Sequence, residues 1–188
     1  ILNSKNLNII VAHMGGGISV GLHYKGRVID VNNALDGEGP FSPERSGSLP
    51  VGDLVEICFS GKYGLTEIKK KIKGEGGLVA YLATSDLREI EERIATGDCY
   101  AREVFEAMAY QISKEIGSLA PIVNGKIDFI ILTGGMANSS ALVELIKDRV
   151  AFIAPVKVKA GEMEMTALMR GASRVLKEEE EPVIYKAM

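Results

Sequence analysis

The sequence contains no tryptophan, two histidines and two cysteines in 188 residues. Cys58 and Cys99 show no metal-ligand spacing, so neither a zinc module nor a disulfide framework is predicted, and a cytoplasmic location is expected. No apolar run approaches the ~20 residues that a membrane span needs. The formal net charge of -3 lacks the basic excess that is typical of nucleic-acid-binding proteins. We therefore expect neither a nucleic acid nor a membrane as a partner.

The composition is that of an ordinary globular protein, with 46% hydrophobic and 25% charged residues. The length suits one good-sized domain or two small lobes that share a core. Ile1, not methionine, opens the sequence, and a strand pattern follows almost at once. We expect the chain to begin partway through a longer protein.

Three short strands are predicted near the start of the chain. Residues 8–13 form an apolar run rich in β-branched side chains, and residues 18–24 alternate between apolar and polar side chains. Residues 27–31 resume the strand pattern after Lys25-Gly26, which is a turn signal. The three segments predict a β-meander with glycine-containing turns.

Helical patterns dominate residues 50–120, and strands and helices alternate after them. Expected helices cover 53–59, 65–72, 86–94 with Asp86 as N-cap, and 98–119. A buried strand at 127–132, a helix from Ser139 or Ser140 to Val150, a strand at 155–158 and a helix at 162–178 complete the prediction. The order βββ-helices-β-α-β-α predicts an α/β fold in which a mixed sheet is flanked by helices.

Three consecutive glycines lie between the first two strands. Because glycine has no Cβ atom, the backbone N–H groups there can gather around an anion. His13 and Ser19 would add side-chain donors at the two edges. The segment is neither a P-loop nor a Rossmann turn, since no Gly-Lys-Ser/Thr follows it and it does not open a helix. A flexible hairpin with a bulge explains the same residues equally well.

A second glycine turn, Thr133–Ser139, lies directly between a buried strand and a helix. This position favours contact between a helix N-terminus and a nucleotide phosphate or ribose, although close strand-to-helix packing is the alternative. Arg45, in a Gly/Pro-rich loop, could reach a transferring phosphoryl group, but a surface arginine is the simpler interpretation. Glu162 and Glu164 open the last helix. Carboxylates in a first helical turn usually complement the helix dipole. The alternative is that they bind the Mg²⁺ carried by ATP, directly or through water.

The segments Val11–Gly21 and Gly26–Gly47 together resemble the acetate kinase family, and within it the butyrate kinases. The resemblance continues to about Leu176. The family belongs to the sugar kinase, Hsp70 and actin superfamily of two-lobed ATPases. The resemblance implies a ribonuclease H-like, actin-like ATPase lobe. Residues 1–188 would form the C-terminal nucleotide-binding lobe, with a helical segment at about 50–120 and the N-terminal lobe missing.

The resemblance also assigns roles to individual residues. Arg45 would be the catalytic arginine, and Glu162 would be linked to Mg²⁺, with Glu164 as the alternative. The hairpin would grip the phosphates of ATP or ADP, and two further segments would contact adenosine. The implied nucleotide-binding residues are His13, Gly15, Gly16, Gly17, Ser19, Asp86, Leu87, Arg88, Gly134, Gly135, Met136 and Asn138.

The implied reaction is phosphorylation of a short-chain carboxylic acid by ATP, namely butyrate and ATP giving butanoyl phosphate and ADP. The alternatives are half of a branched-chain fatty acid kinase and a non-catalytic nucleotide-binding module. Expected partners are the carboxylate, the missing N-terminal lobe and a second copy of this lobe, with the 98–119 helix as the interface. Without the other lobe, efficient turnover is not expected, because positioning and electrostatics supply nearly all of the catalysis.

Overall fold

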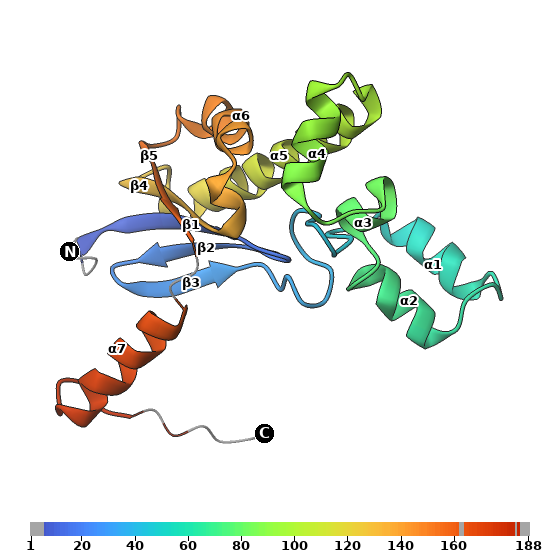
Figure 1. The fold of residues 1–188 in the computed structure, drawn as a ribbon. Coiled ribbons are helices and arrows are strands. Elements are labelled where there is room, and N and C mark those ends of the chain that lie inside the picture. The colour runs from blue at the N-terminus through green and yellow to red at the C-terminus, as the bar shows by residue number, and fades with distance from the viewer. Residues whose placement is uncertain (1–5, 162–163, 183, 185–188) are drawn as a thin grey trace.

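The computed structural model describes residues 6–161, 164–182 and 184. Five strands form one mixed sheet in the order β3-β2-β1-β4-β5 (Figure 1). β1 (Asn8–Met14), β2 (Ile18–Tyr24) and β3 (Arg27–Val31) form an antiparallel meander. β4 (Phe129–Gly134) pairs parallel to β1, and β5 (Val156–Ala160) pairs parallel to β4. The predicted order of elements and the mixed sheet are confirmed.

The helices begin close to the predicted residues because side-chain caps mark their starts. Asp86, Asp98 and Ser139 each accept a hydrogen bond from a backbone N–H in the first turn of the helix that follows. The helices are α1 (Val51–Phe59), α2 (Leu65–Ile72), α3 (Gly77–Leu82), α4 (Leu87–Ala95), α5 (Cys99–Leu119), α6 (Ser140–Val150) and α7 (Glu164–Leu176), with short 3-10 helices η2 (Ala120–Val123) and η3 (Gly135–Asn138).

The sequence prediction missed α3. This helix has six residues and begins at Gly77, whose φ of +60° is unusual for a helical residue. An added Cβ at Gly77 would lie 1.8 Å from the backbone oxygen of Ser42. The glycine therefore allows α3 to pack directly against the loop that carries Arg45.

α5 is the central helix of the core. Its buried residues recur at intervals of three and four, as expected for a helix with one face against a sheet. They are Ala101, Val104, Phe105, Met108, Ala109, Ile112, Ser113, Ile116 and Leu119. Together with α6, α5 covers the sheet face that presents Ile10, Ala12 and Leu132 (Figure 1). The dimer interface expected on this helix stays a prediction, with Tyr100 and Tyr110 as its exposed aromatic residues.

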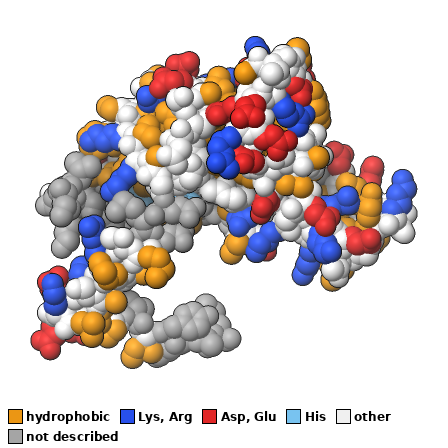
Figure 2. All heavy atoms as spheres, viewed as in Figure 1, with side chains coloured by type: hydrophobic (Ala, Val, Ile, Leu, Met, Phe, Trp, Pro, Cys, Tyr) orange, Lys and Arg blue, Asp and Glu red, His pale blue; other side chains and the backbone are white. Residues whose placement is uncertain are grey.

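Apolar side chains are also exposed on two peripheral helices. None of the residues of α1 is buried, and Phe59 at its end is 87% exposed. Figure 2 shows hydrophobic side chains gathered on α7, where Met165, Leu168 and Met169 are exposed. Within the described ranges, no helix combines the length and the apolar character that crossing a membrane requires.

Glu115 on α5 makes the stability of this fold depend on pH. Partial burial, together with the charges of Asp30 and Glu38, raises the pKa of Glu115 above its usual value of 4.5, against the opposing effect of Lys114. The folded state therefore holds this proton more tightly than the unfolded state, so stability is lost as pH rises from about 4.5 through the raised pKa.

We expect Glu115→Gln to increase the free energy of unfolding at pH 8 by less than about 1 kcal/mol, because solvent screens a half-exposed group. Little change is expected at pH 4, where the native carboxyl is protonated. Urea unfolding at the two pH values measures the difference. Glu103→Gln, on the exposed side of the same helix, is the matched control. An equal effect of Glu115→Gln at both pH values would contradict this explanation.

Candidate functional site

The two glycine turns meet at the carboxyl-terminal ends of the neighbouring strands β1 and β4. β1 and β4 are parallel neighbours, so their carboxyl ends lie side by side and the turns that follow them adjoin. Gly134 has φ +90° and ψ 176°, and a Cβ added there would lie 2.4 Å from the backbone oxygen of Met14. This combination of angles is open almost only to glycine. Glycine at 134 therefore lets the second turn approach the first.

A cavity of about 630 Å³ opens where the turns meet. Gly15 and Gly16 of the hairpin and Gly135 of the second turn contribute to its lining. Its volume is within the range of small-molecule sites, about 300–1,000 Å³. The other lining residues are Pro43, Glu44, Ser85, Asp86, Leu87, Arg88, Glu91, Met136, Asn138 and Ser139. Segments from four parts of the chain thus surround one space.

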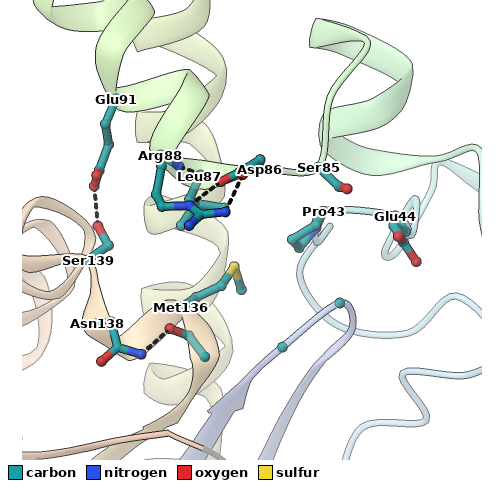
Figure 3. A pocket seen from close by; sticks show the side chains of 13 residues that line it. Pro43, Glu44, Ser85, Asp86, Leu87, Arg88, Glu91, Met136, Asn138 and Ser139 are labelled. Atoms are coloured by element: carbon teal, nitrogen blue, oxygen red, sulfur yellow. Dashed lines mark hydrogen bonds and ion pairs between the residues drawn. The ribbon is translucent and has the colours of Figure 1, made fainter.

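An ion pair at the start of α4 forms part of the cavity wall. The guanidinium of Arg88 donates from Nε and Nη2 to the two carboxylate oxygens of Asp86, at 3.0 and 2.7 Å. The backbone N–H of Arg88 donates to the same carboxylate at 2.9 Å. These interactions lower the pKa of Asp86 to about 2. The pair holds the flat guanidinium on the side of the cavity opposite Met136 (Figure 3).

The loop that carries Arg45 is attached to the glycine hairpin. The Ser42 hydroxyl, fully buried, donates to the backbone oxygen of Gly16 at 2.7 Å. The guanidinium of Arg45 lies against Gly17, where an added Cβ would be 2.1 Å from Nη1, and it donates to the backbone oxygen of Ala34 at 2.9 Å. Arg45 therefore stands beside the hairpin, next to the cavity, without being part of its lining.

The predicted nucleotide-binding residues divide into two groups. Eight of them line the cavity: Gly15, Gly16, Asp86, Leu87, Arg88, Gly135, Met136 and Asn138. Of the others, Gly17 contacts Arg45 and Gly134 packs on Met14. His13 and Ser19 are cross-strand partners on the sheet face opposite to the buried Met14 and Ile18. The roles of both groups stay predictions. Glu162 and the side chain of Glu164 fall outside the described residues.

Five lining residues were not predicted individually as ligands: Pro43, Glu44, Ser85, Glu91 and Ser139. Ser85 and Ser139 nevertheless belong to segments that were expected to contact the nucleotide. Two of the five residues carried a usable signal. Glu91 lies three residues after Arg88 and four after Leu87, so a helix places all three on one face. Ser139 is the N-cap of α6, which begins directly after the second glycine turn. The approach of the loop at Pro43 and Glu44 depends on tertiary packing, and no local pattern predicts it.

The charges around the cavity bear on which ligand it suits. Glu44 lies near the hairpin, with Oε2 3.8 Å from the position of a Cβ added to Gly16. A carboxylate there opposes a polyphosphate unless a cation lies between them. In the part of the chain that the structure describes, no three His, Cys, Asp or Glu residues gather as a metal site. A Mg²⁺ ion would suit these surroundings if the phosphates supplied most of its ligands, as is usual for nucleotide-bound Mg²⁺.

Comparison with known proteins gives one family and one fold. The model of the Acetokinase family matches residues 1–186. Porphyromonas gingivalis acetate kinase matches with a TM-score of 0.80 and 23% identity, over 90% of this chain and 49% of that one. Francisella tularensis propionate kinase matches with a TM-score of 0.76 and 24% identity, over 85% and 47%. Entamoeba histolytica acetate kinase matches with 0.79 and 19%, over 92% and 53%.

These likenesses show the predicted actin-like α/β fold, with a five-stranded mixed sheet and flanking helices. The chain spans about half the length of the kinases that it matches.

Proposed function

Because the chain belongs to the Acetokinase family, we propose that it is the nucleotide-binding half of a kinase that phosphorylates a short-chain carboxylate. Butyrate is the proposed acid, on the resemblance of Val11–Gly21 and Gly26–Gly47 to butyrate kinases. One observation carries the proposal. Two glycine turns that lie about 120 residues apart in the sequence line one cavity of nucleotide size.

In this proposal the nucleotide lies along the cavity with its phosphates at the hairpin. Gly15 and Gly16 offer backbone without side chains at that end, and Arg45 adds a positive charge beside Gly17. The adenosine would lie between the start of α4 and the turn at Gly135–Asn138. There Arg88 presents a flat guanidinium and Met136 a polarisable thioether, both suited to the faces of a purine.

The proposed reaction is a direct in-line transfer. A carboxylate oxygen of the acid attacks the γ-phosphorus and forms the new O–P bond. The bond from that phosphorus to the β–γ bridging oxygen breaks, and ADP leaves with the electron pair. Negative charge spreads over the three other γ-oxygens during the transfer. The guanidinium of Arg45 would stabilise that charge, and the hairpin would hold the phosphates in line.

A Mg²⁺ ion is part of the proposal, since its charge would shield the phosphates of ATP from Glu44. When bound, it would withdraw electron density from the β- and γ-phosphates. Of the described residues, Glu44 is the carboxylate nearest to the hairpin in the cavity lining, and it would hold the ion directly or through water. The residues of this chain would then orient the nucleotide and exclude water from its base.

Calorimetric titration of the chain with MgADP and MgATP, followed by addition of the separately expressed N-terminal lobe, tests this function. We expect nucleotide binding by the chain alone. After the lobe is added, we expect acyl phosphate synthesis, measured as hydroxamate, with butyrate preferred over acetate. Nucleotide binding without any restored synthesis would favour a non-catalytic module. Preference for a branched acid would favour the branched-chain alternative.

A further inference from the structure

A second cavity shares one lining residue, Glu91, with the first. It has a volume of about 490 Å³ and lies between α4, α5 and α6. Glu91 is the one described residue that lines both cavities. The lining of the second cavity is mixed: it includes the apolar side chains of Phe105 and Leu145 and the charged side chains of Arg102 and Glu106 on α5. Glu91 therefore lies where two spaces adjoin, each with the size of a small-molecule site.

A hydrogen bond holds the Glu91 side chain in place. Oε1 of Glu91 accepts from the Ser139 hydroxyl at 2.5 Å, and the Ser139 oxygen accepts from the backbone N–H of Leu142 at 3.0 Å. The bond joins α4 to the N-cap of α6 across 48 residues of sequence. A carboxylate tethered in this way cannot swing aside freely, because doing so would give up a charge-assisted hydrogen bond.

Glu91 lies at the end of the cavity where the proposed function places the base. Figure 3 shows Glu91 and Ser139 at one end of the cavity, with Glu44 and Pro43 at the other. If the phosphates lie at the hairpin, as the proposed function requires, the base points toward Glu91. The purine edge farthest from the ribose carries C6 and its amino group, so that edge faces the carboxylate.

We propose that Glu91 is a specificity-determining residue that limits the size of the nucleobase. The full-length side chain closes the passage to the second cavity and excludes a base with a bulky group at the C6 amino position. Shortening this side chain joins the two cavities, and an aromatic substituent on the base then packs beside Phe105 and Leu145. This inference rests on the proposed nucleotide site and adds to it the residue that sets its depth.

The test measures binding of ADP and of N6-benzyl-ADP to the chain by calorimetry. We expect the wild-type chain to bind ADP and to discriminate against N6-benzyl-ADP by about 100-fold, a magnitude that pocket shape alone can supply. Glu91→Ala should bring the two dissociation constants within a few-fold of each other. Glu91→Ser, a second shortened variant, should do the same if the alanine variant folds poorly.

Three controls distinguish size exclusion by Glu91 from a general effect of the substitution on the fold. Glu91→Gln keeps the size of the side chain and should still exclude the analogue. Glu92→Ala, at an exposed neighbouring position, should leave both affinities unchanged. Ala141→Phe, from an exposed position on α6 that lines the second cavity, should abolish the gain when combined with Glu91→Ala. If Glu91→Ala only made the pocket more flexible, the added Ala141→Phe substitution would not abolish the gain in affinity for N6-benzyl-ADP.

The outcomes distinguish this inference from the proposed function. The role proposed for Glu91 is refuted if the wild-type chain binds N6-benzyl-ADP as tightly as ADP. It is also refuted if shortening Glu91 leaves the ratio of the two dissociation constants unchanged while ADP still binds. In both cases the nucleotide site stands. If ADP does not bind to the wild-type chain at saturating concentration, the proposed function fails and the inference fails with it.

Discussion

Replacing Arg45 with alanine is expected to lower the turnover number of the proposed two-lobed kinase by about 10³-fold, the lower range for an arginine that stabilises phosphoryl transfer. The reason is the position of its guanidinium, against Gly17 at the end of the cavity where the phosphates are proposed to lie. The Michaelis constant for ATP should change little, because the charge that Arg45 neutralises develops mainly in the transition state. Steady-state kinetics of the chain complemented by its N-terminal lobe measure both constants.

Two further variants separate chemistry from folding. Arg88→Ala removes an arginine from the other end of the cavity and should raise the Michaelis constant for ATP several-fold with little loss of turnover. Gly17→Ala keeps Arg45 but places a Cβ 2.1 Å from its Nη1 atom, so the guanidinium must move. This variant should also lose turnover while retaining ADP binding. Near-normal turnover of Arg45→Ala would remove this residue from the mechanism.

Gly134→Ala is expected to have the largest effect on stability, lowering the free energy of unfolding by about 3 kcal/mol or more. The backbone of Gly134 has φ +90° and ψ 176°, and an added Cβ would lie under 3 Å from the backbone nitrogen, carbon and oxygen of Met14. Backbone atoms of a central strand cannot move aside as a flexible side chain would. Thermal unfolding should show a decrease in Tm on the order of 10 °C, together with loss of ADP binding.

Gly117→Ala is the matched control for this prediction. Gly117 lies within α5, and a Cβ added there meets nothing within 4 Å. Because alanine favours a helix interior over glycine by about 1 kcal/mol, this variant should be slightly more stable than the wild type. If Gly134→Ala unfolded at the wild-type temperature, the close approach of the two turns would be wrong.

Local patterns in the sequence predicted most of the fold. The alternation in residues 18–24 and the apolar run at 8–13 marked strands because one face of the sheet is buried under α5. Asp86, Asp98 and Ser139 marked helix starts because their side chains satisfy backbone donors. Where such signals were weak, the prediction failed: α3 is short and begins with a glycine that has a positive φ.

Residues of the candidate site could be predicted only where a local sequence pattern marks them. The glycine turns could be found because consecutive glycines stand out in the sequence, three between two strands and two between a strand and a helix. The pairing of Glu91 with Ser139 could not, because it joins residues 48 positions apart through the packing of α4 and α6 on α5. The strand period offered one unused signal: because Met14 points into the core, its neighbour His13 must point to the opposite face of the sheet.

A crystal structure of the chain with MgADP tests the central claim most directly. We expect the phosphates of ADP beside Gly15 and Gly16 and its adenine between Arg88 and Met136, with the C6 amino edge toward Glu91. ADP bound elsewhere, with the cavity between the two glycine turns empty at saturating nucleotide, would contradict it.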